Sequence, residues 1–264
     1  MLCFLAKAGE KMLKSKRGLS SEALKITALI LMVFNHFCVA YSDFGGNHSY
    51  LFAEGHWYLT RGSFIIYAFL IGEGMIHTRD RKKYLMRLGL FAVISELPFD
   101  LCFYMQPFYI SSQNVFFTLF LGALAIYFID LLRGDVPGQI AVFIVCALAA
   151  ESISSDYGYL GIAVIVSFYV LRGNKARQLI LTGVIFCIVT YFSYFTDYLK
   201  VQPLRPVLQN ISLVNYYAFT EMHGLTALPL IALYNGKRSG HRFKLLFYAA
   251  YPVHLLVIWC IFAF

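Results

Sequence analysis

The stretch Glu73–Leu101, EGMIHTRDRKKYLMRLGLFAVISELPFDL, decides the fold class. Within it an apolar segment ends, a cluster of cations follows, and a second apolar segment begins that carries two carboxylates. A cation cluster between two apolar runs of membrane length is typical of the cytoplasmic turn of a transmembrane hairpin. Carboxylates inside the second run are costly in hydrocarbon unless they are paired or functional. The stretch therefore predicts a membrane protein with paired or functional polar groups inside the bilayer.

The composition of the whole chain supports this prediction. Of its 264 residues, 59% are hydrophobic and only 14% are charged, which is too few charges to cover the surface of a soluble domain. The net charge is +8, but the cations lie in short clusters between apolar runs, where they attract anionic headgroups. We therefore expect membrane lipids as partners and no nucleic acid. The six cysteines are dispersed without metal-ligand spacing, so no metal site is expected.

Nine apolar segments are candidates for membrane spans, since a helix needs about 20 residues to cross a bilayer. We predict an all-α bundle, a polytopic transmembrane domain at residues 22–264 preceded by a basic cytoplasmic tail at residues 1–21. The fifth and sixth segments are short enough to be tilted or re-entrant. The nine segments are residues 22–42, 60–77, 84–103, 115–132, 136–150, 157–171, 176–195, 217–234 and 243–263.

The positive-inside rule gives an orientation. With the N-terminus in the cytoplasm, 19 of the 22 lysines and arginines fall at cytoplasmic ends, and the exceptions are Arg61, Lys200 and Arg205. We therefore expect a multi-pass protein of the inner, cytoplasmic membrane with its C-terminus outside.

Three ionisable groups fall near the middle of their spans: His36 in the first, Glu96 in the third and His254 in the last. Each lies roughly eleven to fourteen residues from the cytoplasmic end, at a rise of about 1.5 Å per residue. Histidine titrates near neutral pH, so two histidines and a carboxylate at one depth favour general acid–base chemistry. The alternative is that each histidine is a neutral structural group, with Asn35 as one available partner for His36.

The other charges of the hairpin can be matched by depth. Glu73 and Arg87 lie near its inner end, and Arg61 and Asp100 near its outer end, so each pair could tie the hairpin together or bind substrate. Glu96 is then left without a cation, on the same helix face as Asp100 four residues later. We expect Glu96 to accept a proton near neutrality or to donate a hydrogen bond to a histidine.

Several further polar residues have both a structural and a functional interpretation. Asp156 marks an outer turn, where it could cap the turn or bind substrate. Glu221 and His223 could contact substrate, but we expect them to form an interfacial pair. Two cytoplasmic clusters could bind phosphate or simply anchor the chain to headgroups. The first contains Arg79, Arg81, Lys82 and Lys83, and the second contains Asn235, Lys237 and Arg238.

A set of motifs in order along the chain resembles the TraX family. They are LKITALILMVFNH, RGSFIIYAFLIGEGMIHTRDRKKYLMRLGLFAVISELPFDL, QNVFFTL, DYG, LYNGKRSG and FYAAYPVHL, from residue 24 to about residue 256. The resemblance implies an integral-membrane acetyltransferase that uses acetyl-CoA, named for a protein that N-acetylates F-type pilin. It also implies that His36 is the catalytic base. The family has Asp-His where this chain has Asn35-His36, so an orienting carboxylate would have to come from another helix. The proline usual after the family's arginine is missing from RGSFIIYAF.

The expected function is transfer of an acetyl group from acetyl-CoA to an amine or hydroxyl of a peptide, such as a pilin, or of a glycan. His36 would act as base, Glu96 would orient it or relay its proton, and His254 would be a second polar contact. The basic clusters would hold the CoA phosphates. Two alternatives remain: a proton-coupled transporter, because such proteins also bury Glu, Asp and His, and a non-catalytic membrane assembly factor.

Overall fold

The computed structural model describes residues 18–45, 49, 51–237 and 244–264. Residues 1–17 of the predicted basic tail lie outside the described part. Within it the chain is a bundle of helices, and its only strand-like pairings are two isolated bridges, Leu19 with Tyr234 and Gln113 with Ser155. The predicted all-α class is therefore confirmed.

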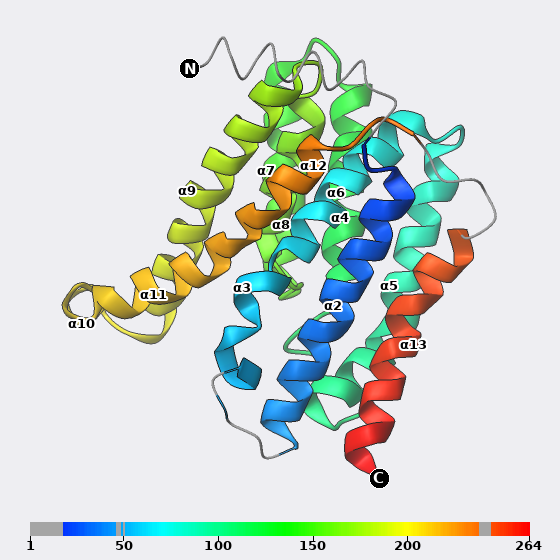
Figure 1. The fold of residues 1–264 in the computed structure, drawn as a ribbon. Coiled ribbons are helices and arrows are strands. Elements are labelled where there is room, and N and C mark those ends of the chain that lie inside the picture. The colour runs from blue at the N-terminus through cyan, green and yellow to red at the C-terminus, as the bar shows by residue number, and fades with distance from the viewer. Residues whose placement is uncertain (1–17, 46–48, 50, 238–243) are drawn as a thin grey trace.

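The helices keep one numbering here and in Figure 1. The longer ones are α2 (Ser21–Asp43), α4 (Gly62–His77), α5 (Arg81–Tyr104), α6 (Val115–Leu131), α7 (Val136–Ser152), α8 (Gly158–Val170), α9 (Lys175–Val201), α11 (Ile211–Met222) and α13 (Lys244–Ala263). Shorter elements are a π-helical turn (Leu51–Gly55), α3 (Trp57–Thr60), α10 (Leu204–Gln209), a 3-10 turn (His223–Thr226) and α12 (Ala227–Ala232).

Side-chain caps explain where several helices begin. Ser20 accepts a hydrogen bond from the backbone N–H of Ala23 at 3.1 Å and starts α2. Asp80 does the same for Lys83 at 3.0 Å, so the cation cluster of the 73–101 stretch opens α5. This hydrogen bond lowers the pKa of the exposed Asp80 carboxyl.

The core lies where α4, α6 and α8 pack together, and almost every residue of α8 is buried. Ile66, Ile126 and Ile165, one from each helix, are completely buried. The peripheral helices instead expose large apolar side chains, for example Ile30, Leu90 and Ile188. Such extensive apolar exposure would be costly in water but suits helices that face lipid.

The basic clusters gather at one end of the bundle, the upper end in Figure 1. Asn235 donates its backbone N–H to Leu19 at 3.0 Å, and Lys175 donates to the carbonyl of Tyr234 at 2.6 Å. Arg81, at the α4–α5 turn, pairs with Asp130 near the α6–α7 turn at 2.5 Å. We call this the basic end. Its existence agrees with the charge count, while the side of the membrane that it faces remains an expectation.

Four helical segments are long and apolar enough to cross a membrane: Ser21–Asp43, Trp57–His77, Lys175–Val201 and Leu246–Ala263. Three shorter apolar helices, α6, α7 and α8, lie among them. The expected segment at 217–234 is helical from residue 217 to residue 232, but it is not a uniform α-helix, because a 3-10 turn separates α11 from α12. At this turn Gly224 packs closely against Phe186 and Ile65, where a Cβ would lie 3.1 Å from the Phe186 ring.

Candidate functional site

His36 and His254 form a hydrogen-bonded pair inside the bundle. The Nδ1 atom of His36 on α2 lies 2.8 Å from Nε2 of His254 on α13. Their rings stack with centroids 5.0 Å apart. Nδ1 of His254 lies a further 2.8 Å from the carbonyl oxygen of Ala250, one turn earlier on α13. A hydrogen bond thus links two histidines that lie 218 residues apart in the sequence.

The direction of these hydrogen bonds follows from their last acceptor. A backbone carbonyl can only accept, so Nδ1 of His254 carries a proton. In the neutral ring its Nε2 is then an acceptor, and Nδ1 of His36 must donate to it. This assignment leaves Nε2 of His36 as the unprotonated nitrogen of the pair. It is the atom that can take up a proton.

Aromatic side chains enclose the pair. The ring of Phe103 meets His36 edge-on at 5.2 Å, and that of Tyr251 does so at 6.0 Å. Phe103 comes from α5, so α2, α5 and α13 together build this site, which we call the histidine site. Both histidines are half-buried, so these apolar contacts reduce the access of water and strengthen the electrostatic effect of each hydrogen bond on the covered side.

Glu96 has a different partner from the one expected. Its Oε2 accepts from the backbone N–H of Asn114 at 3.3 Å and also from the Asn114 side chain. The same side-chain nitrogen donates to the carbonyl of Ala92 at 2.8 Å, and its oxygen caps α6 at Phe116. No direct hydrogen bond joins Glu96 to either histidine within the described residues. Tyr251 is in ring contact with His36 and within electrostatic reach of Glu96.

Asn35, the residue before His36, is also engaged. Its side-chain oxygen accepts from the hydroxyl of Thr60 at 2.8 Å, which ties α2 to α3. The expectation of an orienting carboxylate from another helix is not met by the contacts of His36. His254 is the residue that orients His36, because its Nε2 accepts the hydrogen bond from Nδ1–H of His36.

Both expected ion pairs of the hairpin are wrong. Arg61 pairs with Glu221 at 3.2 Å and stacks on Trp57, whereas Asp100 accepts from the backbone N–H of Tyr109 at 2.9 Å. Glu221 is 4% exposed, and its printed ion pair is with Arg61 instead of the expected His223. Its neighbour His223 instead bonds the carbonyl of Phe219 at 3.0 Å.

At the inner end, Glu73 faces His77 at 3.5 Å on its own helix and not Arg87. Arg87 points the other way and lies within hydrogen-bonding reach of Tyr248 on α13. Depth along a helix does not determine the direction of a side chain around it, and these side chains contact other neighbours than the expected ones.

Asp156 lies in the turn between α7 and α8, as expected. The residue is exposed at the surface, although the protein around it partly desolvates its carboxyl. Removal from bulk solvent and the nearby Glu221 raise the pKa of Asp156 to about 6, against an opposing effect of Arg61. Tyr104 and Tyr251 also face it, from α5 and α13.

This raised pKa predicts a pH-dependent stability difference between the unmodified protein and Asp156→Asn. Below about pH 4 the carboxyl is protonated in both folded and unfolded chains, so it contributes nothing to the pH dependence. Between pH 4 and pH 7 the unfolded chain ionises first, and the unmodified protein loses stability. The melting temperature of the variant minus that of the unmodified protein should therefore rise across this range. A difference that stays constant with pH would contradict the raised pKa.

The residues expected to hold phosphate all lie at the basic end, apart from Arg238, which is outside the described residues. Partners of three side chains in these clusters can be named. Arg81 pairs with Asp130, Lys83 with Asp80 at 3.4 Å, and Asn235 donates to the carbonyl of Gly18 at 2.8 Å. Arg79, Lys82 and Lys237 are exposed. Within the described residues, no group of three or more His, Cys, Asp or Glu is placed to hold a metal ion.

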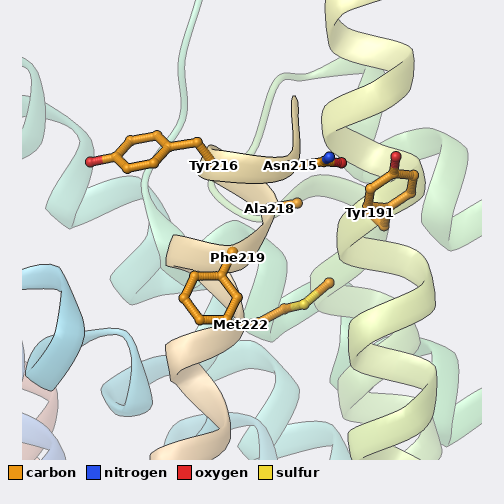
Figure 2. Close-up of a pocket in the computed structure, with 6 residues that line it drawn as sticks. All are labelled: Tyr191, Asn215, Tyr216, Ala218, Phe219 and Met222. Carbon is orange, nitrogen blue, oxygen red and sulfur yellow. The ribbon is translucent and has the colours of Figure 1, made fainter. Parts of the chain in front are cut away.

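Two described hollows lie away from the histidine site. One, of about 460 Å³, opens between α9 and α11, and Figure 2 shows Tyr191 on one wall and Asn215, Ala218 and Met222 on the other. The second, of about 400 Å³, follows an outward apolar face of α13 from Val253 to Ile261. Both lie on apolar surfaces of helices that are candidates for lipid contact.

Sequence reasoning missed the residues that position the site. Asn114 and Thr60 hold Glu96 and Asn35, and Glu221 holds Arg61. One signal was available for Asn114, because an asparagine directly before the apolar run VFFTL is a typical helix N-cap. Nothing in the sequence pattern marks Thr60 or selects Glu221 as the partner of Arg61.

Comparison with known proteins now identifies the family. The family model described as "TraX protein" matches residues 20–262. The chain belongs to the TraX family. A protein from Dichelobacter nodosus, described as "Probable fimbrial assembly protein FimC, serogroup H1", is 27% identical over 262 residues, and the match covers 90% of this chain and 94% of that protein. No solved structure gives a significant match. The resemblance inferred from the motifs is therefore confirmed at the level of the TraX family.

Proposed function

We propose that this TraX family member is an acetyltransferase of the inner, cytoplasmic membrane that uses acetyl-CoA and has His36 as its general base. The observation that carries the proposal is the hydrogen-bond chain from His36 through His254 to Ala250, which leaves Nε2 of His36 free to accept a proton. Acyl transfer to an amine or hydroxyl needs such a base.

The chain of hydrogen bonds can also stabilise the charged state. When Nε2 of His36 takes a proton from the acceptor, the ring becomes an imidazolium whose Nδ1–H still donates to His254. Charge-assisted hydrogen bonds are stronger than neutral ones, so His254 favours the protonated base. His36 can then hand the proton to the thiolate that leaves. Tyr251 is within electrostatic reach of Glu96, so we assign Glu96 a secondary role, in which it relays protons to or from the site through Tyr251.

Bound acetyl-CoA would supply an acetyl group activated as a thioester. The basic end fits its phosphates, because Arg79, Lys82 and Lys237 are exposed cations on one end of the bundle. Arg81, Lys83 and Asn235 fit less well, since each already bonds another protein group. Their contacts favour a structural role, in which they hold the turns of the basic end together.

This distinction gives a prediction for the basic end. Replacing Arg79 and Lys82 with glutamate should raise the KM for acetyl-CoA about tenfold or more with little change in kcat, because phosphate contacts bind the ground and transition states equally. Steady-state kinetics at fixed, low ionic strength would measure it. The matched control is Arg205→Glu, near α10 and far from this end, which should leave KM unchanged. An unchanged KM in the double variant would remove these cations from acetyl-CoA binding.

The direct test of the function is incubation of purified protein with radiolabelled acetyl-CoA and extracts of the source cells. Appearance of a labelled peptide, glycan or small molecule supports acetyl transfer and also names the acceptor. Flux driven by a pH gradient with no labelled product would support the proton-coupled transporter instead. Absence of both signals would refute the enzymatic proposal.

A second candidate function is that of a non-catalytic membrane assembly factor for surface fibres. The description of the relative from D. nodosus as a probable fimbrial assembly protein favours it. The two candidates differ in their dependence on His36. An assembly factor would still support fibre formation as His36→Ala, provided that the variant accumulates normally, whereas an acetyltransferase variant would lose acceptor labelling.

A further inference from the structure

Glu96 and Asp100 are two carboxylates one turn apart on α5 that lack a cation. Residues four apart lie on the same face of a helix, so their charges repel when both are ionised. The one nearby arginine that depth suggested, Arg61, is committed to Glu221. No ion pair joins Glu96 or Asp100 to a lysine, arginine or histidine in the described part of the chain.

Each of these carboxylates has one oxygen bonded and one oxygen free. Oε2 of Glu96 is held by Asn114, and Oδ2 of Asp100 by the backbone N–H of Tyr109. Oε1 of Glu96 and Oδ1 of Asp100 are both buried without a hydrogen-bond partner. Asp100 as a whole is only 2% exposed. A buried carboxylate oxygen without a partner is costly, and two of them on one helix face are more so.

The surroundings of the pair are aromatic and connect it to the histidine site. Phe103 follows Asp100 by three residues on the same face of α5, and its ring touches His36. Tyr104 stacks on Tyr109, from the loop whose backbone binds Asp100, with centroids 3.7 Å apart. Aromatic faces attract cations, so these rings add to the preference of the carboxylates for a positive charge.

We propose that Glu96 and Asp100 together bind one cationic group inside the bundle, either a protonated amine or an inorganic cation. The loop that holds Oε2 of Glu96 and Oδ2 of Asp100 fixes both side chains, and their free oxygens Oε1 and Oδ1 accept hydrogen bonds or coordinate. A bound positive charge removes the mutual repulsion and satisfies both free oxygens at once.

The chemistry of the site suits an ammonium group better than a metal ion. Calcium takes six to eight oxygen ligands and magnesium demands octahedral geometry, whereas Glu96 and Asp100 offer one free carboxylate oxygen each. A primary ammonium has three N–H donors and is satisfied by a few acceptors and an aromatic wall. If that amine belongs to the acyl acceptor, it lies near the base His36; this last step alone rests on the proposed function.

The proposal can be tested by binding, without any acyl transfer. Thermal unfolding of the purified protein at pH 8 is measured with increasing methylammonium, sodium or calcium chloride, against tetramethylammonium chloride at the same ionic strength. Tetramethylammonium carries the charge but has no N–H donor. We expect methylammonium to raise the melting temperature in a saturable way, because a ligand that binds only the folded state stabilises it.

Two variants and one control test whether the rise in melting temperature depends on Glu96 and Asp100. Glu96→Gln and Asp100→Asn should each weaken binding on the order of tenfold, since each removes a charge-assisted contact. Glu151→Gln, which removes a carboxylate from the exposed pair with Lys200, should leave the response unchanged. Direct binding of radiolabelled methylamine to the unmodified protein, with sodium or calcium as competitor, gives a readout that needs no variant to fold.

The outcomes separate the sources of the cation. Saturable binding of methylammonium supports an amine site, and binding of sodium or calcium alone supports an inorganic cation site. A response to none of them overturns the proposal and means that the pair holds a proton instead. A response that survives in both Glu96→Gln and Asp100→Asn also overturns it, because the cation then binds elsewhere. Failure of acetyl transfer would leave these binding results unaffected.

Discussion

Replacing His36 with alanine is expected to abolish acetyl transfer while leaving the protein folded and inserted in the membrane. The substitution removes Nε2, the nitrogen left unprotonated by the hydrogen-bond chain to His254 and Ala250. General base catalysis contributes about 10²–10⁴-fold, so residual transfer should fall by at least that order. The measurement is the initial rate of label transfer from acetyl-CoA, normalised to protein recovered from the membrane.

His254 should behave as a positioning residue. His254→Ala removes the acceptor that holds Nδ1 of His36, so it should lower kcat strongly, whereas His254→Gln offers an amide oxygen in its place and should restore part of the activity. Its loss should also move the acidic limb of the pH–rate profile, because His254 makes the hydrogen bond to Nδ1 of the base. A merely structural residue would not shift that limb.

His223→Ala is the matched control for these two variants. It removes a histidine that bonds a backbone carbonyl on α11, away from the histidine site, and full activity is expected. Full activity in His36→Ala would remove His36 from the mechanism and would leave assembly without catalysis as the better account of the chain.

Helix positions were predictable because apolar runs and caps are local signals. The expected segments 22–42, 115–132 and 243–263 agree with α2, α6 and α13 to within one residue at each end. Hydrocarbon length and helix capping leave little freedom there. The gathering of basic clusters at one end was predictable for a related reason, since charge alternation fixes which turns share an end.

Partner choice was not predictable, because depth along a helix says nothing about rotation around it. Arg61 and Asp100 were matched by depth, yet Arg61 pairs with Glu221 on α11. For the same reason the contact of Glu96 with Asn114 could not be predicted, since it depends on how the loop before α6 folds back on α5. His36 and His254 met in space because both their depth and their helix faces agreed.

The 3-10 turn at 223–226 was missed for another reason. The segment 217–234 is mostly apolar, and hydropathy alone cannot tell a uniform α-helix from one interrupted by a 3-10 turn. The glycine at 224 and the proline at 229 are local signals for a break, but each also occurs in continuous transmembrane helices. Only the close packing around Gly224 decides it.

Removing one partner of the Arg61–Glu221 pair is expected to cause the largest loss of stability. Glu221 is 4% exposed and lies at the end of α11, where the helix breaks against α4. Arg61→Met or Glu221→Leu leaves the other charge buried without its partner, which costs about 3–5 kcal/mol in such cases. The double variant should recover part of the loss, because no uncompensated charge remains. Denaturant titration in one fixed detergent measures the free energy of unfolding of the two single variants and the double variant.

The exposed pair of Lys200 with Glu151 is the matched control. Its atoms are closer, at 2.7 Å, but its side chains are 60% and 36% exposed, so Lys200→Met should cost less than about 1 kcal/mol. Arg61→Met should also raise the pKa of Asp156 further, because Arg61 opposes the rise. If Arg61→Met costs as little as Lys200→Met and leaves the pH dependence of stability unchanged, Arg61 is not the partner that holds this part of the bundle. A role in contacting substrate would then explain its position better.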